Sequence, residues 1–154
     1  MPPPLINMKV TALFFDTPKV KRAVNRAKRR SLSRAGAFIR TRARTSMRRR
    51  RGSAAPGEPP HAHEGSLRRL ILFAYDPAVD SVVVGPLGFR NSAIPGTLEF
   101  GGKEVVKRRR TLKSGKRVIE SKRVNIAARP YMGPALKKEL PNIPRQWANS
   151  VRGG

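Results

Sequence analysis

Cysteine is absent from this chain of 154 residues, and acidic residues are scarce, with 9 Asp plus Glu. Without cysteine there are no disulfides, thiolate metal ligands or cysteine nucleophiles. Long hydrophobic runs are also missing, and none approaches the ~20 residues that a membrane-spanning helix needs. The N-terminal residues lack the basic start and long apolar stretch of a signal peptide. We therefore expect a soluble protein that is made in the cytoplasm and has no membrane partner.

The shortage of acids argues against catalysis. Paired carboxylates for acid–base chemistry are nearly absent, and the sequence contains no nucleophile-elbow, phosphate-loop or dinucleotide-binding fingerprint. His61 and His63 have the spacing of a metal-binding pair, but no other His and no Cys completes a tetrahedral site. We expect a protein that is not an enzyme, with no catalytic residue, no metal and no cofactor.

Positive charge is abundant: 34 Lys plus Arg give a formal net charge of +25. Such a balance repels itself unless a partner neutralises it, and nucleic acid, anionic membranes and acidic protein surfaces are the usual partners. Residues 17–51 hold fifteen Lys or Arg and no acid, and residues 103–123 hold ten. The dense runs 48–51 and 107–110 contain no aromatic residue, so we expect phosphate contact without base stacking or sequence preference.

The first third of the chain predicts a strand followed by a long helix. Residues 5–15 are β-branched and aromatic enough for a strand, after which Asp16 and Thr17 offer an N-cap and Pro18 suits the first helical turn. No proline interrupts residues 19–47, and apolar residues recur there at three-to-four spacing. The resulting stripe consists of Val20, Val24, Ala27, Ala35, Phe38 and Ile39.

The middle of the chain predicts a loop, a hairpin and a helical turn. Residues 52–66 are rich in Pro and Gly and form an extended loop. Residues 67–75 and 81–85 predict two strands around an Asp-Pro turn. Residues 94–100 predict a short helical turn.

The final third predicts a second hairpin and two short helices. The basic segment 103–123 turns at residues 112–115, and its sparse apolar residues do not predict burial, so we expect a projecting arm. Helices are expected from about residue 134 and over residues 143–151. The fold class is α+β in a single domain, residues 1–154: a long N-terminal amphipathic helix packs on a small antiparallel sheet, accompanied by the basic hairpin and a C-terminal helix.

Three segments carry a resemblance. In order, residues 82–86 (Val-Val-Val-Gly-Pro), 97–101 (Thr-Leu-Glu-Phe-Gly) and 128–136 (Ala-Arg-Pro-Tyr-Met-Gly-Pro-Ala-Leu) resemble the head–tail joining and tail-completion family of long-tailed bacteriophages. The resemblance covers roughly residues 17–150. This chain differs from the family pattern in the basic hairpin 103–123, which is inserted between the second and third segments.

The resemblance implies a structural protein of the virion neck, assembled in the host cytoplasm, that forms a ring between head and tail and lets DNA pass. Its implied partners are copies of itself, neighbouring neck, portal-adaptor and tail-tube proteins, and packaged double-stranded DNA bound without sequence preference. We expect residues 52–66 and 103–123 to reach neighbouring subunits or rings. A ribosomal or other RNA-binding scaffold explains the charge equally well, and a DNA-condensing protein is a third reading.

The second segment is expected to form a sharp turn. Phe100 would be pinned in the core, Gly101 would adopt positive φ, and Glu99 would form an ion pair with Arg129 in the third segment. An alternative is that all of these are simply core and turn residues.

The third segment is expected to open the last helix. Pro130 fixes an extended entry after Arg129, while Tyr131 and Met132 would seat the helix on the sheet.

The residues expected to contact a polyanion or an acidic partner are the arginines and lysines of the long helix, its end and the second hairpin. They are Arg22, Arg26, Arg29, Arg30, Arg40, Arg44, Arg48, Arg49, Arg50, Arg51, Lys107, Arg108, Arg109, Arg110, Lys116 and Arg117.

Overall fold

The computed structural model describes residues 17–89, 93–112, 115 and 117–151. The strand expected at residues 5–15, the cap at Asp16 and the candidate contact Lys116 lie outside the described residues. The described chain is mixed α+β, as predicted, and it opens with the long helix α1, Thr17–Ser46.

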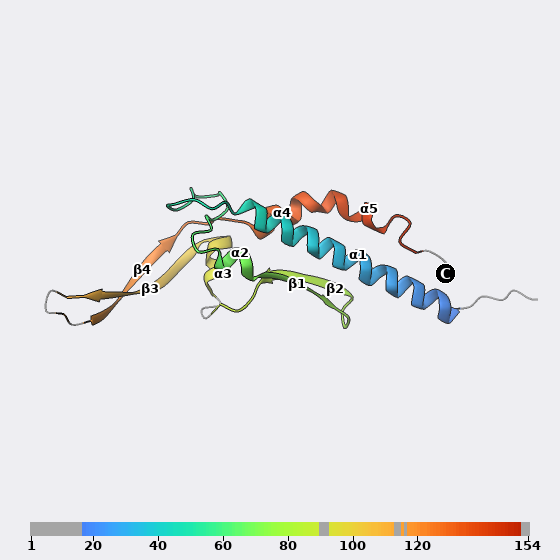
Figure 1. Cartoon of the computed structure of the whole chain (residues 1–154), viewed down its shortest axis with the longest axis horizontal. Helices are drawn as coiled ribbons and strands as arrows, with labels where there is room; N and C mark the ends of the chain where they lie inside the picture. The colour runs from blue at the N-terminus through green and yellow to red at the C-terminus, as the bar shows by residue number, and fades with distance from the viewer. Residues whose placement is uncertain (1–16, 90–92, 113–114, 116, 152–154) are drawn as a thin grey trace, which may run out of the picture.

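Helix α1 lies between two layers (Figure 1). On one side it packs against a two-stranded antiparallel sheet, β1 (Ile71–Asp76) and β2 (Ser81–Pro86). On the other side it packs against the C-terminal helices α4 (Met132–Glu139) and α5 (Ile143–Trp147). The prediction that the C-terminal helix sits on the sheet is therefore wrong in its partner, because α1 separates the two layers.

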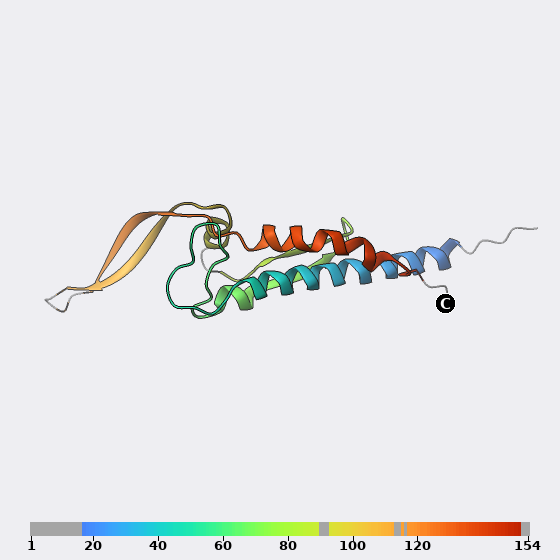
Figure 2. The same cartoon turned by 90° about the horizontal axis from the view of Figure 1, so that it is seen from above.

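Small residues carry the packing of α1. Its buried positions are Ala27, Ser31, Ala35, Gly36, Ile39 and Ala43. The expected apolar stripe is wrong at Val20, Val24 and Phe38, which are exposed. The first turns of α1 extend beyond both the sheet and α5 (Figures 1 and 2), so the two valines have little to pack against.

The central core gathers residues from distant parts of the chain around the C-terminal half of α1. Ile39, Ala43 and Met47 of this region pack with Ala62, Ile71, Tyr131 and Ala135. The expected strand over residues 67–75 is wrong in its first half, which forms the short helix α2, Ser66–Leu70. Gly65 is left-handed there (φ 74°), and its carbonyl accepts a hydrogen bond from the Arg69 N–H, so a helical turn precedes Ile71.

The second hairpin projects from one end of the molecule as an arm (Figures 1 and 2). It follows the short helix α3, Ala93–Phe100, and consists of β3 (Gly102–Thr111) and β4 (Arg117–Ile126). The two strands pair only with each other, and most of their residues are exposed. A hydrogen bond from the Gly115 N–H to the Leu112 carbonyl closes the predicted turn.

Prolines mark the starts of the last two helical segments in the C-terminal region. Helix α4 ends at Glu139, a 3₁₀ turn (η1, Leu140–Asn142) follows, and α5 begins at Ile143. Pro141 and Pro144 lie in the first turns of η1 and α5, where no N–H donor is needed. Both expected helices are therefore present, but the second is shorter than predicted, because α5 ends at Trp147 and Ala148 is extended.

Candidate functional site

The second and third segments of the resemblance meet the loop of residues 52–66 at one place, which we call the joint. It comprises the end of α3, the strap (residues 127–133) and the loop of residues 52–66. The joint lies where the arm leaves the body of the molecule, beside the N-terminus of α4 (Figure 1).

Glu99 caps α4 from outside the helix. One carboxylate oxygen accepts hydrogen bonds from the backbone N–H groups of Tyr131 (2.8 Å) and Met132 (3.0 Å). The other accepts from the N–H of Gly133 (2.7 Å). The first N–H groups of a helix have no partner within the helix, and a negative charge there also interacts favourably with the helix dipole. One side chain of α3 thus satisfies three donors of the strap and α4.

Arg129 serves the same joint but does not pair with Glu99. Its Nε donates to the carbonyl of Ala54 (2.9 Å) and its Nη1 to that of Ala127 (3.3 Å), while its backbone N–H donates to Leu98 (2.7 Å). The expected ion pair is therefore wrong. Three backbone N–H groups occupy the carboxylate, so the motifs are joined through the main chain instead.

Gly101 and Phe100 behave differently from each other. Gly101 has φ 76°, as predicted, and a Cβ placed on it would lie 3.0 Å from the backbone nitrogen of Ala128. Phe100, expected in the core, is 84% exposed. It is the last residue of α3, and the positive φ of Gly101 turns the chain there, which leaves the ring at the surface.

Tyr131 anchors the strap in the core. It is 1% exposed and belongs to the cluster that contains Ile39 and Ile71. Burial, together with the charge of Glu99, raises the pKa of Tyr131 to about 12. Its phenol therefore stays neutral across the physiological range. The preceding Pro130 is half-buried within the strap.

Within the joint, the loop of residues 52–66 is folded against the strap and the segment after α1. Ala54 and Ala62 are buried. The Gly57 N–H donates to the backbone carbonyl of Ala128 (2.8 Å), and the Ala62 N–H donates to the backbone carbonyl of Arg48 (3.0 Å). His61 lies beside the Gly52 carbonyl, with its Nδ1 3.0 Å from that oxygen. These backbone hydrogen bonds hold the loop against the strap and against the segment after α1.

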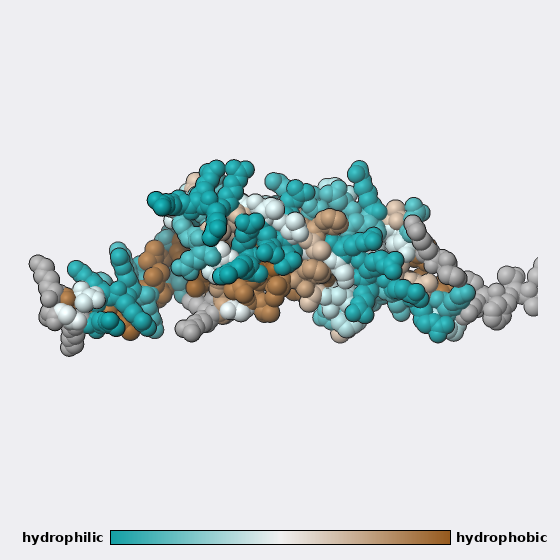
Figure 3. All heavy atoms as spheres, viewed as in Figure 1, coloured by the Kyte–Doolittle hydropathy of each residue, from teal (hydrophilic) through white to brown (hydrophobic). Residues whose placement is uncertain are grey.

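An apolar cavity of about 480 Å³ opens beside the joint. Its lining comes from all three segments of the resemblance, together with α1; it includes Ile39, Val82, Val84, Phe100, Tyr131 and Leu136. Figure 3 shows hydrophobic residues gathered near the middle of the molecule, between hydrophilic ends.

Several cations of α1 have partners within the protein. Lys28 forms an ion pair with Asp80, which also accepts a hydrogen bond from the Tyr75 hydroxyl (2.6 Å). The hydrogen bond from Lys28 holds the pKa of Asp80 below its usual value. Arg29 lies over the Tyr75 ring, 5.9 Å from its centre. Arg40 is half-buried, and its Nε donates to the carbonyl of Ile71 (2.8 Å).

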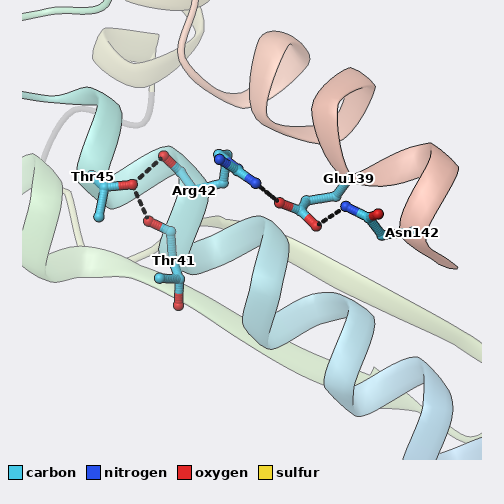
Figure 4. Close-up of polar contacts among 5 residues, drawn as sticks. All are labelled: Thr41, Arg42, Thr45, Glu139 and Asn142. Atoms are coloured by element: carbon cyan, nitrogen blue, oxygen red, sulfur yellow. Dashed lines mark hydrogen bonds and ion pairs between the residues drawn. The ribbon is translucent and has the colours of Figure 1, made fainter. Parts of the chain in front are cut away.

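Arg42 connects α1 to α4, a contact that the sequence analysis missed. Its Nε and Nη2 lie 2.7 and 2.6 Å from one oxygen of Glu139, whose other oxygen accepts from the Asn142 amide (3.2 Å; Figure 4). Glu139 is buried, yet the hydrogen bond from Arg42 holds its pKa below the usual value. No local spacing links residues 97 positions apart, so only the packing of the two helices shows this pair.

We expect Arg42→Met to lower the free energy of unfolding at pH 7 by about 2 kcal/mol, because a buried carboxylate loses its charged partner. The lowered folded-state pKa of Glu139 makes this stabilisation present above the unfolded-state value of about 4.3 and lost as the pH falls through the folded-state pKa. Urea unfolding between pH 7 and pH 3 measures the difference. An equal loss in the exposed-site control Arg26→Met at pH 7 would contradict the assignment.

The remaining arginines of α1 and its end are candidates for an external partner. Arg22, Arg26 and Arg30 are exposed and recur at four-residue spacing, which places them on one face of the helix. Exposed Arg34 continues this row and was missed in the sequence analysis. Arg44 is half-buried, and the run of residues 48–51 is exposed in the irregular segment after α1.

The arm has two chemically different faces. The pairing runs without interruption from Gly102 opposite Ile126 to Thr111 opposite Arg117, so odd-numbered residues of both strands share one face and even-numbered residues share the other. The run of residues 107–110 is therefore not a single cluster. Lys107 and Arg109 lie on the odd face, and Arg108 and Arg110 on the even face.

Two kinds of site are not found in the described part of the chain. None of its helices is long and apolar enough to cross a membrane, and none of its side chains form a group of three or more His, Asp or Glu that could hold a metal ion.

Comparison of the chain with protein-family models, curated proteins and solved structures found no match.

Proposed function

We propose that this chain is a structural, non-enzymatic protein of a phage neck, which assembles into a ring that joins head and tail and lets DNA pass. The observation that carries the proposal is the cavity beside the joint. Three short segments, separated by up to some fifty residues of sequence, carry the family resemblance and line one cavity, with Glu99 and Arg129 binding α3 to the strap. This arrangement supports a shared structural role for the three motifs.

The arm supports assembly through contacts between subunits. Its even face carries four aliphatic residues, Val106, Val118, Val124 and Ile126, of which the three valines are 46%, 41% and 38% exposed. Covering exposed aliphatic residues of an isolated two-stranded ribbon with a neighbour removes apolar surface from water, which favours association. We propose that this even face packs on the next subunit of the ring or on an adjacent neck ring.

Sizing and negative-stain imaging of the purified protein, after nuclease treatment and at moderate salt, test the ring directly. We expect a closed oligomer of uniform size. A monomer that elutes with RNA and loses it on nuclease treatment would overturn the proposal and favour the RNA-binding scaffold.

The double substitution Val106→Ser/Val118→Ser tests the route of assembly. It is expected to shift the oligomer toward the monomer, because the covered aliphatic area is lost. Val83→Ser is the control, since Val83 is 61% exposed in β2, away from the arm. Rings that persist in the double variant would contradict assembly through the even face.

A further inference from the structure

The odd face of the arm concentrates positive charge. Lys103, Lys107, Arg109, Arg117 and Arg123 lie on it, all exposed, and it contains no acid. The even face instead combines three cations, Arg108, Arg110 and Lys122, with two acids, Glu104 and Glu120, for a net charge of +1. Val105 and Ile119 are the aliphatic residues of the odd face. We call this odd face the basic face.

We propose that the basic face binds the phosphate backbone of a double helix. Five cations without an acid complement a surface of one charge sign, and guanidinium groups bind phosphate through paired donors. Protein surfaces usually mix both signs, whereas a nucleic-acid backbone carries a continuous row of negative charges. No aromatic residue lies in either strand, so the face lacks the stacking platforms that hold single strands.

The dimensions of the arm fit such a partner. Ten residues per strand span about 34 Å, close to one turn of B-form DNA. The arm is a twisted ribbon whose two strands pair with no other strand (Figure 2), so its basic face is open to a row of phosphates. Cations on alternate residues of both strands thus contact phosphates without reading the bases.

Phosphate binding by the basic face deepens the proposed function. It rests on that function only for the identity of the duplex, because a neck ring meets DNA. It assigns the two faces of one arm to different partners: the even face to protein and the basic face to phosphate. Assembly and nucleic-acid binding are therefore expected to fail separately.

A pair of interleaved variants tests this assignment. Lys107→Gln/Arg109→Gln removes two charges from the basic face, and Arg108→Gln/Arg110→Gln removes two from the even face of the same strand. Binding to a fluorescent 24-base-pair DNA duplex is measured across a salt series for each full-length protein. For the first variant we expect the slope of log K against log salt to become shallower by about 2, and for the second by less than 1.

Other ligands and readouts separate the outcomes. An RNA duplex of the same length distinguishes the source of phosphate, while a single strand and polyglutamate test the duplex claim. Equal losses in the two variants, no loss in the first, or equally tight binding of polyglutamate or the single strand would overturn the inference. Sizing without nucleic acid reports assembly independently, so a monomer that keeps the difference between faces would overturn the ring and leave the basic face standing.

Discussion

Glu99→Ala is expected to lower the free energy of unfolding by about 3 kcal/mol, since charge-assisted hydrogen bonds and helix caps contribute about 1–3 kcal/mol each without adding fully. The carboxylate satisfies the N–H groups of Tyr131, Met132 and Gly133, and all three donors lose their acceptor in the variant. These donors are part-buried, so water replaces the carboxylate poorly. Urea unfolding at pH 7 measures the loss.

Two further variants identify the cause of that loss. Glu99→Gln keeps the shape but has one acceptor oxygen and no charge, so an intermediate loss of about 2 kcal/mol is expected. Glu64→Gln raises the net charge by the same amount at an exposed position of the loop. If Glu99→Ala were no less stable than Glu64→Gln, the carboxylate would not hold the joint.

Gly36→Leu is expected to cost about 3 kcal/mol or more, at the upper end of overpacking effects in cores. Gly36 lies where α1 crosses the β1–β2 sheet, and even a single Cβ there would lie 2.6 Å from Val82 Cγ2 and 2.9 Å from Phe73 Cδ2. A leucine forces the helix away from the sheet. Thermal and urea unfolding with matched protein concentrations measure the change.

Gly36→Ala and Gly96→Ala form a matched pair for this effect. Both replace a helical glycine by the best helix former, which by itself stabilises by about 1 kcal/mol. A Cβ on Gly96 meets nothing within 4 Å, so Gly96→Ala is expected to raise stability. Gly36→Ala is expected to lower it by about 1 kcal/mol, since the contact outweighs the propensity. Stabilisation by both would show that α1 and the sheet do not approach closely at Gly36.

Several parts of the fold follow from signals along the chain. The uninterrupted run after Pro18 predicts α1, the turn chemistry around Asp76 and Asp80 predicts the first hairpin, and the charge of residues 103–123 predicts an exposed arm. Gly101 was identified because a sharp turn after α3 requires positive φ. These features depend on neighbours within a few residues, so a single sequence contains them.

Two members of the joint were predicted to meet, but their contacts were not, and the place of the loop of residues 52–66 beside them was not predicted. The motifs identified Glu99 and Arg129 as partners, yet the carboxylate accepts from the main chain of α4 and the guanidinium donates to carbonyls. Opposite charges predict an attraction, but they do not specify which donors bind the carboxylate in the folded protein. That choice depends on where the strap enters α4, which only the packed structure decides.

The sequence by itself determined the large positive charge, the α+β composition and the places where the chain turns. Only the tertiary structure decided which cations are used inside the protein, as Arg40 and Arg42 are, and which face outward, as Arg26 does. It also divided the run of residues 107–110 between two faces of the arm. The physical reason is that charge and propensity belong to single residues and short spacings, whereas burial and strand register belong to contacts between distant segments.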